Sequence, residues 1–392
     1  MNAVAPAAAA SLEPILVEAI RAAGPIPFAR FMEICLYHPE HGYYMRGLGG
    51  GGGRDYLTSS GVHRAYGTLV ARQAAEMWRL LGTPARFRFV EFGPGEGRFA
   101  RDVLEASRSD RPFAAALEYV LVETSPALRE RQRRLLAPGG GGAAGAPSVS
   151  WNTLEGLESE ADERDGFAGC LFANEVLDAF PVHRVTGTPE GPREVHIDVE
   201  NGVFREKLLP LSTPDLVEDL DARGLAPAPG QIVDVAPAAA HFVGRAARLL
   251  SRGWFVLVDY GDRAEDLFHP ARRRGTLRAF HRHRLVDDVL ARPGEQDLTA
   301  HVDFTAVRRA AATAGCEVAG QVSQSHFLLA LGALEGFEAQ DLAGREALKD
   351  LVLPDRMGGA FQVLVLARGA APAGLRGLSA PWRDRPAGKG TA

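Results

Sequence analysis

The sequence contains little cysteine. Its three cysteines, Cys35, Cys170 and Cys316, are odd in number, lie far apart and form no CxxC pair. This spacing argues against a disulfide framework, and it is not the spacing of cysteine ligands in zinc sites. We therefore predict buried free thiols in a reducing compartment and no metal site.

The chain also lacks a long apolar run and an excess of positive charge. No stretch approaches the roughly 20 apolar residues that a membrane-spanning helix needs. The start, MNAVAPAAAASLEP, has no Lys or Arg before Arg21, which argues against a secretory signal or an Arg-rich transit peptide. With 44 Lys and Arg against 49 Asp and Glu, nothing favours nucleic acid as a partner. We predict a soluble cytoplasmic protein without a membrane span.

What the chain does contain is an alternation of short apolar runs and helical patterns along 392 residues. The runs predict strands at 87–92, 117–123, 148–154, 169–173 and 254–260. Two later runs, 327–331 and 361–367, are predicted to close the sheet as an antiparallel pair. Strands that alternate with helices predict a doubly wound α/β sheet.

Glycines and turn signals divide the chain. Six glycines within 47–53 end a predicted N-terminal helical cap, 1–53, and residues 54–392 form the main domain. Two segments are predicted as insertions in that domain, at about 182–229 and 262–325. The first alternates and contains the turn Glu200-Asn201-Gly202, which indicates a β-hairpin. The second is predicted to hold loops and helices without strands.

The stretch Phe87–Arg101, FRFVEFGPGEGRFAR, is typical of a strand, a glycine loop and a helix. Three glycines within five residues let the backbone turn sharply and approach a ligand without Cβ collisions. The start of the helix offers unpaired N–H groups and a positive dipole end, which favour carboxylate, phosphate or hydroxyl groups. This stretch predicts a site for a nucleotide-like cofactor.

Polar residues lie at the ends of three other predicted strands or directly after them: Glu123, the pair Asn174 and Glu175, and Asp259. In open α/β sheets, ligands bind beyond the carboxyl ends of the strands. Glu123 lies 26 residues after Gly97, about the spacing at which an acid accepts hydrogen bonds from both ribose hydroxyls. An acid at this place is equally able to cap a helix, and both interpretations stay open.

Two cofactor classes fit the glycine loop. Gly95–Ala100 matches the dinucleotide pattern G-x-G-x-x-[GA], so a nicotinamide oxidoreductase stays open. The longer string Glu91–Gly97, EFGPGEG, resembles the acid-x-G-x-G-x-G loop of class I S-adenosylmethionine-dependent methyltransferases. Pro94 between glycines is awkward for a turn that cradles a pyrophosphate, and a terminal antiparallel hairpin is the usual methyltransferase ending. Both details favour methyl transfer.

A second string makes the resemblance more specific. Phe172–His183, FANEVLDAFPVH, resembles the N-E-x-x-D-A-x-P-V signature of the MidA family of methyltransferases. Gly24–Tyr44, Gly275–Phe280, Gly294–Phe304 and Pro354–Leu364 are similar to other segments of that family, in the same order. The family includes an arginine methyltransferase that assists assembly of mitochondrial complex I. The resemblance implies a class I (Rossmann-like) methyltransferase sheet, S-adenosylmethionine as cofactor, and a protein arginine as acceptor, such as one on a respiratory complex subunit.

The resemblance also implies roles for individual residues. Those expected to bind the cofactor are Glu91, Gly93, Pro94, Gly95, Gly97, Glu123 and Thr58. Those expected to act on the acceptor are Asn174, Glu175 and Asp178, because a carboxylate orients a guanidinium bidentately and attracts its charge. For Asp178, capping of the turn before Pro181 is an open alternative.

One segment departs from the family pattern, which there reads G-D-F-x-T-[SA]-P-E-[IV]-S. Residues 54–63, RDYLTSSGVH, keep Asp55 and Thr58 but lack the Pro-Glu pair, so a changed substrate class stays open. Two further alternatives stay open for the whole chain: an NAD(P)-dependent oxidoreductase, and an assembly chaperone that has the methyltransferase fold without turnover.

Overall fold

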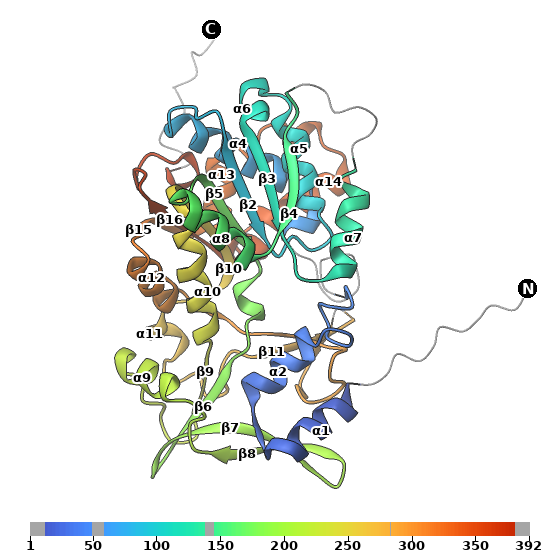
Figure 1. Ribbon diagram of the computed structural model, residues 1–392, viewed down its shortest axis with the longest axis vertical. Coiled ribbons are helices and arrows are strands. Elements are labelled where there is room, and N and C mark those ends of the chain that lie inside the picture. Colours follow the sequence, from blue (N-terminus) through green and yellow to red (C-terminus); the bar gives the residue numbers. More distant parts are fainter. Residues whose placement is uncertain (1–11, 49–58, 138–144, 283, 381–392) are drawn as a thin grey trace, which may run out of the picture.

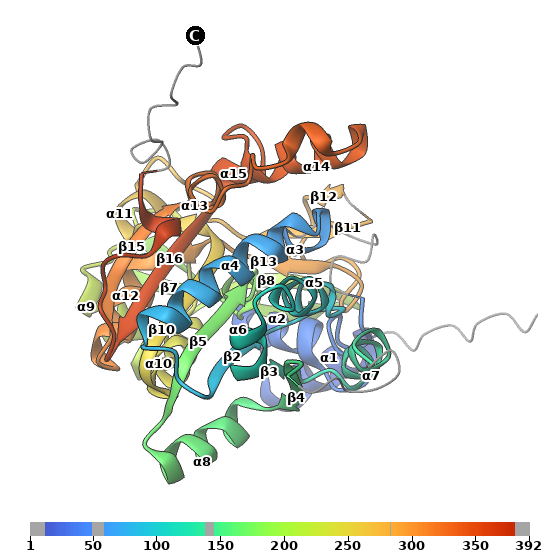
Figure 2. The ribbon, with the colours of Figure 1, turned by 90° about the horizontal axis from the view of Figure 1, so that it is seen from above.

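The computed structural model describes residues 12–48, 59–137, 145–282 and 284–380, and an eight-stranded sheet lies at its centre (Figures 1 and 2). The strand order is β15-β16-β10-β5-β2-β3-β4, and β14 pairs with β10. The strands β4, β3, β2, β5 and β10 run parallel, whereas β16 is antiparallel to β10 and β15. Their bounds are β2 Phe87–Phe92, β3 Leu117–Val122, β4 Ser148–Asn152, β5 Phe167–Asn174, β10 Leu250–Asp262, β14 Val302–Asp303, β15 Glu317–Ser323 and β16 Phe361–Arg368.

Helices cover both faces of this sheet, as the doubly wound prediction requires. On one face, α4 (Ala65–Leu80), α5 (Arg98–Ser107), α6 (Arg111–Ala116), α13 (Gln324–Ala330) and α14 (Leu342–Val352) contribute to one hydrophobic core. On the other face, α8 (Leu154–Arg164), α10 (Pro237–Arg248) and α12 (Phe304–Thr313) contribute to a second. Adjacent residues of β2 serve different cores, Phe89 the first and Val90 the second. A strand buried on both faces must be apolar throughout, which is why these runs are visible in the sequence.

A second sheet lies below the central one in Figure 1, and β1, β7, β6 and β9 follow one another in it, with β8 paired to β7. All of its pairs are antiparallel. The bounds are β1 Ile26–Pro27, β6 His183–Thr188, β7 Gly191–Glu200, β8 Val203–Leu209 and β9 Ile232–Val235. The turn predicted at Glu200–Gly202 joins β7 to β8, with positive φ at Asn201 and Gly202 as a two-residue hairpin loop demands.

The N-terminal helices α1 (Glu13–Ala23) and α2 (Phe28–Tyr37) pack on this second sheet. A third core joins Leu16 and Phe31 of these helices to Ile197 of β7 and to Leu298. Leu298 belongs to a small sheet of β11 (Arg278–His281), β12 (Arg284–Val286) and β13 (Asp297–Thr299). The N-terminal segment therefore shares one core with both predicted insertions. The division at residue 53 stays a prediction, and most of the glycine stretch at 47–53 lies outside the described residues.

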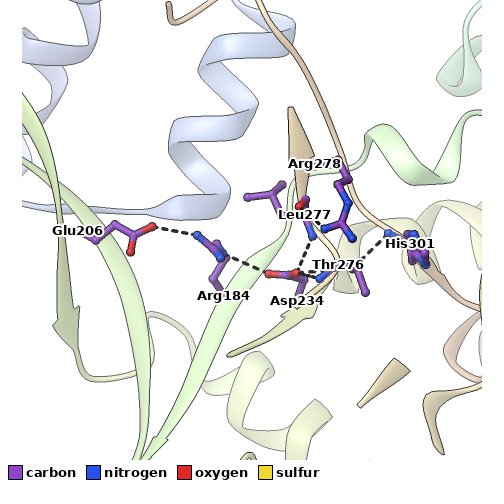
Figure 3. Close-up of polar contacts among 7 residues, drawn as sticks. All are labelled: Arg184, Glu206, Asp234, Thr276, Leu277, Arg278 and His301. Atoms are coloured by element: carbon purple, nitrogen blue, oxygen red, sulfur yellow. Dashed lines mark hydrogen bonds and ion pairs between the residues drawn. The ribbon is translucent and has the colours of Figure 1, made fainter. Parts of the chain in front are cut away.

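A buried carboxylate attaches the segment after Gly275 to the second sheet (Figure 3). Oδ2 of Asp234, on β9, accepts hydrogen bonds from the backbone N–H groups of Thr276 and Leu277. Its Oδ1 accepts from Nε of Arg184, whose guanidinium also pairs with Glu206. These bonds fix the start of Gly275–Phe280, one of the segments on which the family resemblance rests.

Two strand predictions were wrong. Residues 262–325 contain β11 to β15, and residues 327–331 belong mainly to helix α13 rather than to a strand. A short apolar run fits a helix as well as a strand, and Phe327 and Leu328 face the first core from α13, which Ser323 caps through its hydroxyl. The partner of β16 is instead β15, an edge strand whose residues are half-buried or exposed and therefore carry no apolar pattern.

The remaining described helices are short or peripheral: α3 Ser59–Val62, α7 Pro126–Leu135, α9 Pro214–Arg223, α11 Ala264–Leu267 and α15 Met357–Ala360. Within the described ranges, no helix has both the length and the apolar character to cross a bilayer. All three cysteines are buried and free, as predicted.

Candidate active site

The glycine loop follows β2 and needs glycine for its backbone angles. The φ values of Gly93, Gly95 and Gly97 are 61°, 53° and 81°, in the left-handed region that side chains disfavour. A Cβ on Gly93 would lie 2.9 Å from Cγ2 of Val176, and the N–H of Gly97 closes the turn on the carbonyl of Pro94 at 2.9 Å. Helix α5 then begins at Arg98, with Gly97 as its N-cap and no capping side chain.

Glu91 lies within β2, beneath this loop, and is buried. Its Oε2 accepts a hydrogen bond of 2.7 Å from the hydroxyl of Tyr119. Burial raises the pKa of Glu91 to about 8, although the bond from Tyr119 opposes the shift. In the absence of a neighbouring cation, this carboxyl therefore holds its proton at neutral pH.

Glu123 follows β3 and is held by two neutral donors. Its Oε1 accepts from the backbone N–H of Ser125 at 2.7 Å, and its Oε2 accepts from Nε2 of Gln132 at 3.1 Å. Burial raises the pKa of Glu123, against the lowering effect of these bonds. The same Gln132 amide donates to the carbonyl of Gly95 at 2.7 Å, so one side chain connects the glycine loop to Glu123.

The sequence analysis missed Gln132. The charged run at 129–134 predicts a solvated face of a helix, and most of its side chains are indeed half-buried or exposed. Gln132 is wholly buried, and its Oε1 accepts from Nε1 of Trp151 at 3.0 Å. Only its amide, a polar group without charge among arginines, distinguishes it in the sequence.

Asn174 ends β5, and Glu175 begins the turn that follows it. The hydroxyl of Tyr66 donates to Oδ1 of Asn174 at 2.6 Å, and Nδ2 of Asn174 donates to Oε1 of Glu175 at 3.0 Å. Glu175 has a φ of 54°, a conformation that costs a non-glycine residue on the order of 1–3 kcal/mol. Oδ2 of Asp259, on β10, holds the following turn by accepting from the backbone N–H groups of Val176, Leu177 and Asp178.

These strand ends open into one cavity of about 880 Å³, which we call the cleft. It lies between the central sheet and the second sheet, because residues from α2, β6 and α10 complete its walls. The predicted site residues that line the cleft are Glu91, Gly93, Pro94, Gly95, Glu123, Asn174 and Glu175. The structure therefore brings together residues that are far apart in the sequence.

Two predicted site residues lie outside the cleft lining, and a third is not described. Gly97 caps α5 and is not part of the cleft lining. Asp178 is buried behind the cleft and borders a separate cavity of about 20 Å³. Burial raises the pKa of Asp178 to about 6, and a hydrogen bond with Tyr260 lowers it in part. Thr58 lies outside the described residues.

The charged residues in the lining of the cleft are predominantly acidic. It includes six glutamates and two arginines, Arg30 and Arg98. Arg30 pairs with Glu33, and Arg98 pairs with Glu96. Glu91 and Glu123, by contrast, accept hydrogen bonds from neutral donors. Such a site attracts a cationic ligand and repels a polyphosphate.

These residues suit a nucleoside that carries hydroxyl groups and positive charge. The left-handed glycine loop exposes backbone to the cleft, Glu123 offers carboxylate oxygens, and the buried carboxyl of Glu91 can lose its proton to pair with a cationic group. Fold and cleft together define an α/β enzyme that binds such a cofactor beyond the carboxyl ends of its strands.

Comparison with known proteins names the family. Residues 69–322 match the family described as "Putative S-adenosyl-L-methionine-dependent methyltransferase". The chain belongs to this methyltransferase family, and S-adenosylmethionine is its cofactor. The resemblance to MidA methyltransferases that the motifs indicated is thereby confirmed.

The chain is similar to individual relatives over most of their length. The chain is 32% identical to "Protein arginine methyltransferase NDUFAF7 homolog, mitochondrial" of Drosophila melanogaster, over 91% of this chain and 84% of the relative. It is 31% identical to the human NDUFAF7 protein arginine methyltransferase, over 81% and 72%. A COG1565 superfamily protein from Burkholderia thailandensis, crystallised with S-adenosyl-homocysteine, superposes with a TM-score of 0.83 at 31% identity, covering 97% of this chain and 98% of its own.

The prediction of a cytoplasmic protein was wrong by this comparison, because these curated relatives are named as mitochondrial. The prediction rested on composition, on free cysteines, on the lack of a long apolar run, and on first residues without the pattern of a secretory signal or an Arg-rich transit peptide. Free thiols are compatible with any reducing compartment, so they do not distinguish one such compartment from another.

Proposed function

We propose that this protein transfers a methyl group from S-adenosylmethionine to an arginine nitrogen of a protein substrate. One observation carries the proposal: Asn174 and Glu175, in a strained turn, line the same acidic cleft as the glycine loop. The names of the relatives, protein arginine methyltransferases, support the choice of acceptor. As the protein partner we propose a respiratory complex subunit, for which the motif resemblance is the support.

In this proposal the loop and the acids hold the cofactor. The backbone at Gly93–Gly97 and the carboxyl of Glu91 bind its methionine part, and Glu123 accepts hydrogen bonds from its ribose. When bound, the cofactor supplies an electrophilic methyl group on a sulfonium. Thr58 is proposed as a further contact by resemblance alone.

Glu175 orients the acceptor in this proposal. Its carboxylate accepts hydrogen bonds from the substrate guanidinium and offsets its charge, which places one nitrogen in line for transfer. Asn174 fixes the Glu175 carboxylate through the 3.0 Å bond from Nδ2. Asp178 acts as a positioning residue, because its carboxylate bonds to Tyr260 outside the cleft.

The two rival functions make different predictions. A nicotinamide oxidoreductase would need a site for a pyrophosphate, which the acidic lining repels. Calorimetry with S-adenosyl-homocysteine and with NADP⁺ decides between the ligands. A non-catalytic chaperone would function with an altered Glu175.

The experiment for the acceptor compares cells that contain the wild-type protein, the Glu175→Gln variant or neither. Glutamine keeps the shape and an oxygen for the Asn174 bond but loses the charge. Mass spectrometry of the proteome should find a methyl-arginine present only with the wild type. If the variant restores that modification and complements the deletion fully, the proposed role of Glu175 is wrong.

A further inference from the structure

A histidine paired with a buried carboxylate lies in the wall of the cleft. His183 is the first residue of β6, and its Nδ1 lies 2.7 Å from Oε1 of Glu194 on the neighbouring strand β7. The side chain of Glu194 is completely buried, and its Oε2 accepts from the backbone N–H of Ser212 at 2.7 Å. Although burial acts to raise the pKa of Glu194, the bonds and charge from His183 and the Ser212 bond bring it below its ordinary value.

An ionised Glu194 determines which ring nitrogen carries the proton. A carboxylate only accepts hydrogen bonds, so Nδ1 of His183 must be the donor. Nε2 is then the basic nitrogen when the ring is neutral, and among the described residues it forms no hydrogen bond. The ring lines the same cleft as Asn174 and Glu175, and its side chain is 19% exposed.

Methylation of a guanidinium needs such a base. Transfer breaks the carbon–sulfur bond with its electron pair left on sulfur, and forms a carbon–nitrogen bond from the nitrogen lone pair. The nitrogen that gains the methyl group then has one hydrogen too many for a stable guanidinium, so one N–H bond breaks and a proton leaves. In a cleft whose charged residues are mostly acidic, a neutral acceptor for that proton is more useful than a carboxylate that already binds the guanidinium.

The geometry points to His183 as the proton acceptor of the reaction, with Nε2 receiving the proton from the methylated nitrogen while Glu194 stabilises the resulting imidazolium. The inference rests on the proposed arginine methylation. It divides the work between two sides of the cleft: Glu175 orients the guanidinium from the central sheet, and His183 removes the proton from the second sheet.

Other charged or titratable groups face this part of the cleft. Helix α2, which packs against β6 and β7, contributes Arg30, Glu33 and Tyr37 to the lining, and Arg30 and Glu33 pair with each other. Tyr37 donates its hydroxyl to the carbonyl of Ala179. On β7, His196 is buried and contacts the backbone carbonyl of Glu194. It is not among the cleft-lining residues and provides a matched control.

The test combines single-turnover kinetics with NMR on the full-length protein. Extract from cells that lack the protein serves as the acceptor pool, with enzyme in excess and S-adenosylmethionine labelled in its methyl group. The rate of label transfer to methyl-arginine is measured across pH 5.5–9.5, and the ring protons of His183 are titrated by NMR, assigned with His183→Gln and His196→Gln. The wild-type rate should rise with pH, reach half of its maximum at the midpoint of the NMR titration, and level off above it.

His183→Gln should lower the plateau rate by about 100-fold and remove the histidine-dependent rise, with cofactor affinity unchanged. Glu194→Gln should shift the NMR midpoint and the kinetic midpoint to lower pH together, and His196→Gln should shift neither. A His183→Gln variant with the wild-type rate and pH profile overturns the inference alone. A wild type that labels no arginine overturns the proposed function, and the inference with it.

Discussion

The hydroxyl of Tyr66, on α4, donates a 2.6 Å hydrogen bond to Oδ1 of Asn174 at the end of β5. Burial raises the pKa of Tyr66 far above its usual value, and the charges of Glu175 and Glu91 add to the shift, so the hydroxyl remains a donor. Because Oδ1 faces Tyr66, the amide nitrogen of Asn174 must face Glu175, to which it donates. One buried hydroxyl therefore sets the orientation of the carboxylate that we assign to the acceptor.

Tyr66→Phe should loosen the orientation of the Asn174 amide and of the Glu175 carboxylate, without changing the affinity for the cofactor. Loss of one hydrogen bond is worth about 1 kcal/mol, so we expect a rate of methyl transfer lower by about 5–10-fold. Steady-state kinetics measures the rate, and calorimetry should show unchanged affinity for S-adenosyl-homocysteine.

Tyr119→Phe is the matched control for this variant. It removes a buried hydroxyl from the same face of the sheet, but one that bonds to Glu91 rather than to Asn174. Cofactor affinity should fall in Tyr119→Phe while the rate at saturation is retained. Identical kinetic effects of the two variants would contradict the separate roles of Asn174 and Glu91.

Cofactor binding should release a proton from Glu91. Below pH about 8 the buried carboxyl is protonated, and a cationic ligand favours the carboxylate. Affinity for S-adenosylmethionine should therefore rise with pH and level off above that value. Calorimetry in buffers of different ionisation enthalpy measures the number of protons released on binding. Glu91→Gln should abolish the part of this proton release that comes from the Glu91 carboxyl.

The same carboxyl should affect the stability of the ligand-free protein with the opposite sign. Between its ordinary pKa of 4.5 and about 8, the unfolded chain has lost a proton that the folded protein retains. The free energy of unfolding should therefore fall as pH rises through this window. In Glu91→Gln, urea denaturation should show a shallower fall of the free energy of unfolding with pH. A slope identical to that of the wild type would mean that a group other than Glu91 titrates in this window.

Gln132 should matter for cofactor affinity because it connects Gly95 to Glu123. Gln132→Leu removes both bonds and leaves the carbonyl of Gly95 without this donor, so affinity should fall by about 10-fold or more. Trp151→Phe removes only the third bond of Gln132 and should leave the affinity unchanged. Equal losses in the two variants would mean that the effect is general destabilisation.

Gly275→Ala should destabilise the protein strongly. The φ of Gly275 is +69°, and a Cβ would lie 2.2 Å from Oδ2 of Asp234, which anchors the segment seen in Figure 3. We expect a loss of about 2–4 kcal/mol in the free energy of unfolding, measured by urea denaturation.

Gly224→Ala isolates the backbone part of that cost. Gly224 has a φ of +61°, but nothing lies within 4 Å of its Cβ position, so its cost should be only about 1–2 kcal/mol. Equal losses at Gly224 and Gly275 would show that the contact with Asp234 has no energetic weight.

The sequence predicts those parts of the fold and cleft that local pattern determines. The strands β2, β3 and β5 are apolar because both their faces are buried, and Gly93, Gly95 and Gly97 are glycines because positive φ demands it. The residues predicted to bind the cofactor are chosen from their places near strand ends and from the family resemblance.

Contacts that depend on pairing between distant segments could not be predicted. His183 and Glu194 meet only because β6 pairs with β7, and Gln132 reaches Gly95 only after α7 has packed beside the loop. Asp178 shows that a sequence signature can also indicate a residue that the fold keeps out of the cleft. A signature places it three residues after Glu175, yet the turn that Asp259 holds points it away from the cleft.

The most direct test of the account is transfer of a labelled methyl group in vitro. Purified protein is incubated with methyl-labelled S-adenosylmethionine and extract from cells that lack it, and the protein fraction is hydrolysed to amino acids. We predict label in methyl-arginine with the wild type and a loss of at least 100-fold with Glu175→Gln, at unchanged affinity for S-adenosyl-homocysteine. Label in any other amino acid, or full activity of Glu175→Gln, would contradict the account.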